Sequence, residues 1–296
     1  MHASVARRRE VRLAYLLLSP AVLLLAVVLG YPTGWEVWTS LTNLSPLNDA
    51  GAAFVGLENY RRIAGDPEFW RAATVTVAYA AITSVAKVAI GVAFALLLAR
   101  PFRGRALVFL AVFLPWAYPA SVSVIGWYWT LNPPISTAYS AFMGGIKHAA
   151  DSAFGGGAWS FASVTLFNVW RGSSFIGVLL LAGINAVPPE LFECALLESK
   201  SAWSRFWRVT VPLLKPFLAL AVFLSLTTAF VDLANVWMLT GGRIVFPVIG
   251  TQAYWLAIRG GQFGPASALS LTLVPFLLAA LLLLFRAFDP PDEERA

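Results

Sequence analysis

Residues 72 to 99 read AATVTVAYAAITSVAKVAIGVAFALLLA, a stretch in which Lys87 is the single charged side chain. A helix needs about 20 mostly apolar residues to cross the hydrocarbon core of a bilayer, which is about 30 Å thick. The segment must be helical because lipid offers no hydrogen-bond partner to open backbone groups. This stretch therefore predicts a membrane-spanning helix.

The same pattern recurs five more times along the chain. With the first stretch included, the apolar segments are Arg12–Tyr31, Ala72–Ala99, Ala106–Leu131, Trp159–Ile184, Phe217–Leu239 and Pro265–Phe288. Hydrophobic residues make up 59% of the 296 residues and charged residues 12%, whereas soluble domains average about 45–50% apolar and about 25% charged. We therefore predict an all-α, polytopic membrane protein with about six transmembrane helices, and no room for a large soluble catalytic domain.

The positive charges indicate how these helices are oriented. Lys and Arg gather before the first span, between spans two and three, between spans four and five, and after span six. Cytoplasmic loops carry an excess of Lys and Arg, so both termini are predicted in the cytoplasm (N-in/C-in). Because the basic stretches are short and flank spans, nucleic acid is not an expected partner. The N-terminal run lacks a small-x-small cleavage site, which favours a retained span over a signal peptide.

Few residues are available for catalysis or metal binding. Cys194 is the only cysteine, and His2 and His148 are the only histidines, so a Cys- or His-built metal centre is not expected. An intramembrane serine protease would have only Lys87 as a base. A Walker A loop needs Gly directly before its Lys, and no lysine here follows a glycine. We therefore predict that the chain is not an enzyme and has no nucleotide-binding site of its own.

The connection from Asn185 to Pro216 is the longest predicted cytoplasmic segment. Two prolines followed by Glu190 favour a helix start, and the residues from Glu193 to Ser201 are predicted to form a short helix. Phe206 and Trp207 follow as an apolar pair. Such a helix with exposed aromatics suits a docking surface for a soluble partner, or equally a helix lying in the headgroup layer.

This segment resembles the EAA loop of permease subunits in binding-protein-dependent ABC importers. The family's Glu, Phe and two Pro positions are matched, at the family's spacing, by Glu193, Phe206, Pro212 and Pro216. Segments similar to the carbohydrate-uptake class are Val55-Gly56-Leu57-Glu58-Asn59-Tyr60, Trp170-Arg171, Leu181-Ala182-Gly183-Ile184 and Leu239-Thr240-Gly241-Gly242. The chain departs from the family pattern at Cys194, Glu198 and Ser199-Lys200, where the family has Ala, Asp and Gly-Ala. Without that glycine the turn inside the loop is expected to differ.

The resemblance implies the remaining parts of an importer in the cell (inner) membrane. The expected partners are a second permease subunit, commonly a different chain, a dimeric cytoplasmic ATPase that uses ATP and Mg, an extracytoplasmic solute-binding protein, and membrane lipid; this chain itself is expected to bind no cofactor. Residues 1–11 would be a cytoplasmic tail, 12–288 the transmembrane permease domain with its coupling loop at 185–216, and 289–296 a second cytoplasmic tail. The residues implied in ATPase coupling are Glu193, Ala195, Glu198, Ser199, Phe206 and Pro212.

Polar residues inside the spans suggest the solute path. At 100° per residue, Ser225, Thr228, Asp232 and Asn235 share one face of span five, and Asn168 and Arg171 lie on one face of span four. An ionisable residue in mid-membrane costs about 2.5–3.5 kcal/mol, so it normally faces a bundle interior or an aqueous cavity. The alternative is that these groups only hydrogen-bond neighbouring helices. We expect Arg171 to pair with Asp232, with Lys87 as the rival partner.

Taken together, the sequence predicts the permease subunit of an ATP-driven importer for a sugar or related polyol, working by alternating access. A permease for another polar solute, such as a glycerol phosphodiester, is the alternative within transport. An ATP-independent channel is the alternative from a different class.

Overall fold

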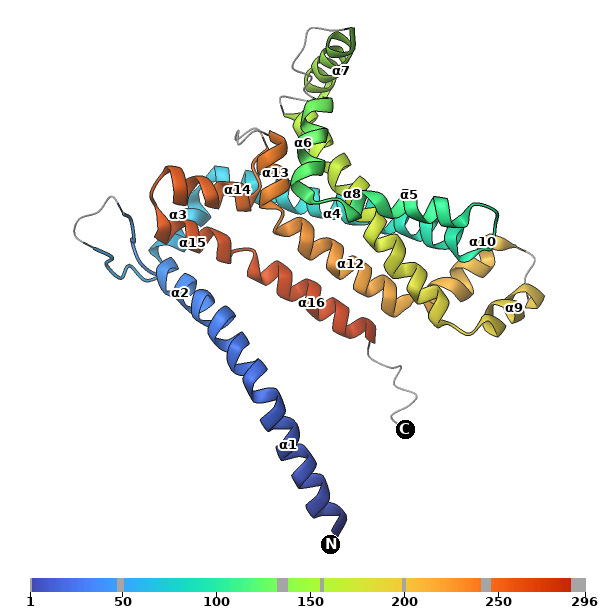
Figure 1. Cartoon of the computed structure of the whole chain (residues 1–296). Coiled ribbons are helices and arrows are strands. Elements are labelled where there is room, and N and C mark those ends of the chain that lie inside the picture. Colours follow the sequence, from blue (N-terminus) through green and yellow to red (C-terminus); the bar gives the residue numbers. More distant parts are fainter. Residues whose placement is uncertain are drawn as a thin grey trace. The chain divides into compact units, whose positions relative to one another are not determined.

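The computed structural model describes residues 2–46, 51–131, 138–154, 157–198, 201–240 and 246–288 (Figure 1). These residues are helical almost throughout, and the only β-type contact among them is one bridge between Thr42 and Phe54. The all-α prediction is confirmed. Contacts divide the chain into two compact units, Met1–Asp66 with Ala253–Thr272, and Pro67–Gln252 with Leu273–Ala296.

The first unit is built around the end of its second helix. Its helices are α1 (His2–Leu25), the π-helical turn η1 (Ala26–Gly30), α2 (Tyr31–Ser40), α3 (Glu58–Gly65), the π-helical turn η3 (Trp255–Arg259) and α15 (Phe263–Leu271). The Asn59 side-chain amide donates to the carbonyls of Ser40 and Thr42, both at 2.8 Å. Asn59 therefore replaces the helix partners that these carbonyls lose where α2 ends, which gives the segment Val55–Tyr60 a structural role.

Helix α15 approaches the residues that follow α2 so closely that a glycine is required at the contact. The Gly264 N–H donates to the Leu44 carbonyl at 3.1 Å, and a Cβ at this position would collide with the Thr42 carbonyl oxygen. Because the obstacle is backbone, which cannot turn aside, position 264 accepts only glycine without local rearrangement.

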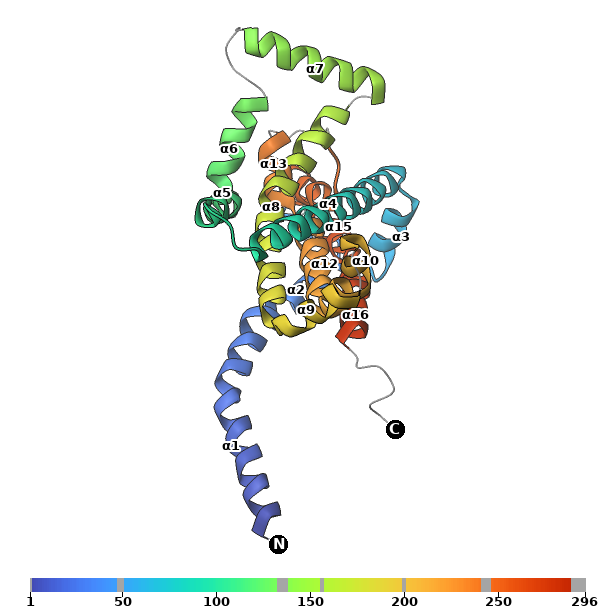
Figure 2. The ribbon, with the colours of Figure 1, turned by 90° about the vertical axis from the view of Figure 1, so that its right-hand side faces the viewer.

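The second unit is organised by the crossing of two long helices, α4 and α8 (Figure 2). Its helices are α4 (Pro67–Ala99), α5 (Arg105–Ala117), α6 (Ala120–Leu131), α7 (Ala138–Phe154), α8 (Ala158–Ala186), α9 (Pro189–Glu198), α10 (Ala202–Arg205), the π-helical turn η2 (Phe206–Thr210), α11 (Val211–Leu213), α12 (Lys215–Phe230), α13 (Leu233–Thr240) and α16 (Val274–Phe288). The sequence boundary between the two units, after Gln252, falls inside α14 (Ile249–Tyr254). At the crossing, a Cβ on Gly91 would lie 2.6 Å from Ile176 Cγ2 and 3.1 Å from the Gly177 nitrogen. Small residues of this kind allow helices to approach closely inside a membrane.

The apolar core of this unit joins three helices. Its buried members are Ala95, Leu98, Ile176, Leu180, Leu181 and Ala221, which come from α4, α8 and α12. On the other side of α12 lies α16, where Phe230 and Phe276 stack with ring centroids 5.8 Å apart. Many large apolar side chains outside this core are exposed, as expected for helices that face lipid.

Four helical segments of the described chain are long and apolar enough to span a bilayer: Val11–Ser40, Pro67–Ala99, Ala158–Ala186 and Phe263–Arg286. The number rises to 6 if each of two bent helix pairs is counted as one span. The second of these pairs is Ala202–Leu213 with Lys215–Phe230, which meet at 76°, so this pair reaches back into the predicted coupling loop. The prediction of about six spans is met when both bent pairs are counted as spans.

Span three, predicted as one helix over Ala106–Leu131, is broken. α5 and α6 meet at an angle of 93°, and Tyr118 between them is extended, with φ −72° and ψ 144°. The next residue is Pro119, whose ring disfavours a helical conformation in the residue before it. The proline therefore accounts for the bend.

Span five, predicted over Phe217–Leu239, is also interrupted. α12 ends at Phe230 and α13 begins at Leu233. Asp232 lies directly before α13 and accepts a hydrogen bond from the Asn235 side chain at 2.7 Å. Aspartate favours such a position at the start of a helix over the interior of one. A single helical wheel therefore does not describe this segment.

Candidate functional site

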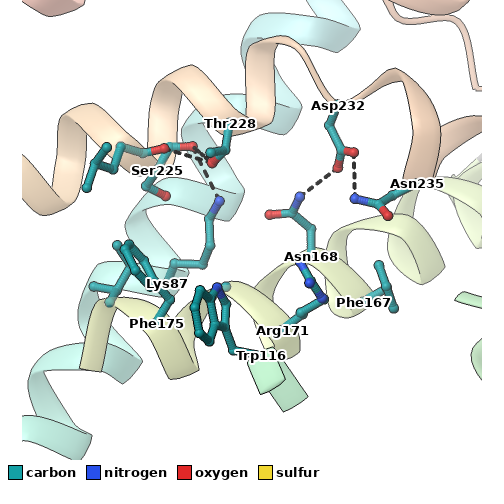
Figure 3. A pocket seen from close by; sticks show the side chains of 13 residues that line it. Lys87, Trp116, Phe167, Asn168, Arg171, Phe175, Ser225, Thr228, Asp232 and Asn235 are labelled. Carbon is teal, nitrogen blue, oxygen red and sulfur yellow. Dashed lines mark hydrogen bonds between the residues drawn. The ribbon is translucent and has the colours of Figure 1, made fainter. Parts of the chain in front are cut away.

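Polar residues from spans two, four and five line one cavity of the second unit (Figure 3). Its volume is 330 Å³, within the range of about 300–1,000 Å³ typical of small-molecule sites. The lining residues are Lys87, Trp116, Phe167, Asn168, Arg171, Gly172, Phe175, Ile176, Leu224, Ser225, Thr228, Asp232 and Asn235. All six residues expected on the solute path are among them, although the helix break at Asp232 changes the geometry that brings them together.

Asp232 is the hub of the polar network at one end of the cavity. Its Oδ2 accepts from the Tyr79 hydroxyl at 2.8 Å and from Asn168 Nδ2 at 2.7 Å. Its Oδ1 accepts from Asn235 Nδ2 at 2.7 Å. The donors come from α4, α8 and α13, so the carboxylate at the helix break ties three helices together.

The expected ion pair between Arg171 and Asp232 is not present in the structure. Among the described residues, the three side-chain donors to Asp232 are all uncharged, and the Arg171 Nη2 atom reaches the Tyr118 carbonyl at 3.5 Å. The physical reason is that amide and hydroxyl donors already occupy both carboxylate oxygens. Lys87, the rival partner, donates instead to the Ser225 carbonyl at 3.3 Å.

Lys87 is almost fully buried, with 2% of its surface exposed. Its aliphatic stem lies against Gly172, where an added Cβ would collide with Lys87 Cδ. The glycine therefore makes room for the lysine between α4 and α8, and the ammonium group lies at the cavity beside α12 (Figure 3).

Three buried polar atoms of the cavity residues have no hydrogen-bond partner within the described part of the chain. They are Asn168 Oδ1, Arg171 Nε and Ser225 Oγ. Buried polar groups normally have partners, and one left without costs about 1–3 kcal/mol. Acceptor, donor and hydroxyl groups of this kind in one cavity are suited to binding a polar solute.

Aromatic rings form the apolar part of the lining. Trp116 stacks on Phe175 with ring centroids 5.4 Å apart, and Phe167 is fully buried beside Trp127. The wall thus combines flat apolar faces with a few polar groups, the usual composition of a ligand pocket.

The predicted coupling loop contains a second cluster of candidate residues. The helix expected from Glu193 to Ser201 begins earlier, at Pro189, in agreement with the proline start signal, and α9 ends at Glu198. Ser201 is extended and its Oγ accepts from the Ser204 nitrogen, so the prediction that it is helical was wrong. Glu193 is exposed and Ala195 is buried, whereas Ser199 lies outside the described residues.

Aromatic residues follow this helix as one exposed cluster. Phe206 lies 5.2 Å from Trp207 and 6.3 Å from Trp203 between ring centroids. Trp203 is 72% exposed and Trp207 52%, and Pro212 lies beyond them in α11. Exposed clusters of large apolar side chains mark surfaces that contact another protein or the membrane.

Comparison with known proteins places this architecture in a family, although no family model matches the chain. Over 292 residues the chain is 32% identical to the trehalose transport system permease protein SugA of Mycobacterium tuberculosis, covering 97% of this chain and 93% of SugA. Over 281 residues it is 31% identical to the inner membrane ABC transporter permease protein YcjO of Escherichia coli, covering 93% and 94%. The chain belongs to the permease subunits of ABC sugar transporters.

A solved structure shares the fold of this ABC permease. It is a bacterial alginate ABC transporter in complex with an alginate pentasaccharide-bound periplasmic protein, with a TM-score of 0.68, 17% identity and coverage of 94% of this chain and 93% of the matched chain. Members of the family are transport components and not enzymes, in agreement with the absence of a Walker A lysine. The resemblance drawn from the EAA loop is thus confirmed at the level of the family.

Sequence reasoning missed several residues of the site in this ABC permease. Tyr79 was overlooked inside an apolar stretch, although a buried tyrosine hydroxyl normally needs a partner and this one finds Asp232. Trp116 was unassigned because its place in the cavity depends on the bend at Pro119. Lys87 was considered as an ion-pair partner and as the base of a protease, and not as part of the solute path.

Proposed function

We propose that this chain is the permease subunit through which a sugar or related polyol crosses the inner membrane, and that the cavity around Asn168, Arg171 and Ser225 is part of the path. The observation that carries the proposal is the set of unpartnered polar atoms that these three residues hold in one cavity among membrane-spanning helices. Sugar hydroxyls both donate and accept hydrogen bonds, so they can satisfy the Asn168 oxygen, the Arg171 nitrogen and the Ser225 hydroxyl.

The aromatic lining supports the same class of solute. A sugar ring presents apolar C–H groups as well as hydroxyls, and Trp116 and Phe175 offer flat faces for them. Relatives of the chain are named for the transport of trehalose, of trehalose and maltose, and of sulfoquinovosyl glycerol. A hydroxyl-rich solute is thus favoured over a general polar one.

The proposal includes the energy source, because the chain has no Walker A lysine of its own. Both termini lie in the cytoplasm, with residues 1–11 and 289–296 as tails, 12–288 as the permease domain and 185–216 as the coupling loop. A separate dimeric ATPase, using ATP and Mg, docks on α9 and the aromatic cluster of Trp203, Phe206 and Trp207. Its closure drives alternating access.

The coupling residues divide by their exposure. Glu193 and Pro212 are exposed and contact the ATPase, while Ala195 is buried and holds α9 against the rest of the loop. Phe206 supports the two exposed tryptophans, and Glu198, at the end of α9, and Ser199 take part in the coupling to the ATPase. A second permease chain and an extracytoplasmic binding protein complete the importer.

The first test is a mild-detergent pull-down of the chain from its native membrane, with Glu193→Arg as the variant. Glu68→Arg is the matched control, since it reverses an exposed carboxylate at the start of α4, outside the coupling loop. We expect the native chain and the control to recover an ATPase and a second six-span protein, and Glu193→Arg to lose the ATPase. Recovery of a stable chain alone, without ATPase, would refute the coupling role and favour a channel.

A further inference from the structure

The cavity has more positive charge than its own residues compensate. Lys87, Arg171 and Asp232 are the ionisable side chains in its lining, which gives two cations and one carboxylate. Both oxygens of Asp232 accept hydrogen bonds from uncharged donors, with distances of 2.7 to 2.8 Å. The carboxylate is therefore engaged, and one positive charge in the cavity has no counterion among the described residues.

The two cations also have unused donors. A lysine ammonium has three N–H donors and an arginine guanidinium has five. Lys87 has one acceptor among the described residues, the Ser225 carbonyl at 3.3 Å, and Arg171 has the Tyr118 carbonyl at 3.5 Å. Arg171 Nε is buried without any acceptor in the described chain.

The unused donors of Lys87 are buried, so they are not simply hydrogen-bonded to bulk water. Lys87 is 2% exposed and Ser225 is 1% exposed, so bulk solvent contributes little to either. Charged residues inside a membrane are costly and mark substrate or ion pathways when they persist. A cation that only stabilised helix packing would be expected to contact the nearby carboxylate, and in this structure neither one does.

We propose that the solute of this cavity is an acidic sugar, a polyhydroxylated molecule with one anionic oxygen group. The anionic group binds between Lys87 and Arg171, and the hydroxyls bind Asn168 Oδ1 and Ser225 Oγ. A carboxylate, a sulfate ester or a sulfonate shares the required chemistry, because each presents several oxygens that accept from guanidinium and ammonium groups. A single negative charge brings the formal charge of the cavity to zero. The inference rests on the proposed function and specifies its substrate class.

The test compares sugars that differ in charge at one position. The purified membrane complex of this chain with its partner permease and ATPase is titrated calorimetrically with glucose, glucuronate, glucose 6-sulfate and acetate. We expect glucuronate and glucose 6-sulfate to bind at least about tenfold more tightly than glucose, a difference of about 1.4 kcal/mol. Acetate should bind more weakly than glucuronate, because it lacks the hydroxyls.

Three variants assign the preference to the cations. Lys87→Met and Arg171→Gln should reduce the ratio of glucuronate to glucose affinity to about threefold or less, while Arg171→Lys, which keeps the charge, should retain most of it. Arg208→Gln is the control, because it removes a cation from the coupling loop and leaves the cavity intact. Since Lys87→Met removes a buried, packed side chain, Arg171→Gln provides the second reading if that variant fails to fold.

The outcomes separate this inference from the proposed function. Glucose binding as tightly as glucuronate, or an unchanged ratio in a folded Arg171→Gln protein, overturns the acidic-sugar inference and leaves the importer intact. Acetate binding as tightly as glucuronate reduces the site to a simple anion site, and no binding of any sugar also overturns the inference. A chain that recovers no ATPase overturns the proposed function itself.

Discussion

Replacing Asp232 with alanine removes the hub that joins three helices of the second unit. The carboxylate accepts from Tyr79, Asn168 and Asn235 at 2.8, 2.7 and 2.7 Å. Hydrogen bonds between membrane helices contribute about 0.6 kcal/mol on average and at most about 1.7 kcal/mol each. Two of the three bonds, from Tyr79 and Asn168, join different helices, whereas the Asn235 bond is local. The loss of these two predicts a decrease of about 1 to 3 kcal/mol in the free energy of unfolding, a substantial part of the total stability of most domains, about 5–15 kcal/mol.

The assay is titration of the detergent-purified chain with SDS, followed by circular dichroism. Asp232→Asn should cost less than alanine, because its oxygen still accepts from two donors and the Asn235 amide can turn to offer its oxygen. Tyr79→Phe removes one bond and should cost about 0.6 to 1.7 kcal/mol. The control is Thr228→Val, whose hydroxyl bonds the Leu224 carbonyl of its own helix at 2.7 Å. An Asp232→Ala protein as stable as the native chain would refute the role of the hub.

Two further substitutions test the packing of each unit. Gly91→Val places a side chain where a Cβ already lies 2.6 Å from Ile176 Cγ2, so we expect a loss of about 1 to 3 kcal/mol in the same titration. Gly126→Val is the control, because nothing lies within 4 Å of a Cβ there, and equal losses in both variants would contradict the close crossing of α4 and α8. Asn59→Ala deprives the carbonyls of Ser40, at the end of α2, and of Thr42 of their amide donor. Limited proteolysis should then cleave the segment between α2 and α3 faster than in the native chain, and an unchanged cleavage rate would show that the carbonyls need no such cap.

The helical spans were predictable because hydrophobic length alone decides whether a segment can cross a bilayer. The helices bend where local chemistry competes with that length. Pro119 disfavours a helical Tyr118, and Asp232 starts a new helix. Both residues are visible in the sequence. A proline inside a membrane helix is often tolerated, and an aspartate there normally faces a cavity or a bundle interior without breaking the helix, so only the structure shows that these two produce breaks.

The sequence predicted that these polar residues share one cavity, and it did not predict their contacts with one another. The helical period correctly grouped Asn168 with Arg171, because α8 is continuous through both residues. The pairing of Arg171 with Asp232 followed from charge alone and failed, since uncharged donors on three helices reach the carboxylate first. Such contacts depend on the relative rotation of packed helices, which one sequence does not encode in any short pattern. Tyr79, 153 residues from its partner, illustrates the difficulty.

The central claim is that ATP in a partner subunit changes access to the cavity lined by Thr228. It is tested most directly by labelling Thr228→Cys with a water-soluble thiol reagent in a Cys194→Ala background, in membranes that hold the complete importer. Ala52→Cys, at an exposed position between α2 and α3 and outside the candidate spans, is the control. We predict that trapping the ATPase with vanadate changes the labelling rate of residue 228 by about tenfold or more, as a shift between two states requires, and leaves residue 52 unchanged. Equal labelling of residue 228 in the resting and trapped states would contradict alternating access through this cavity.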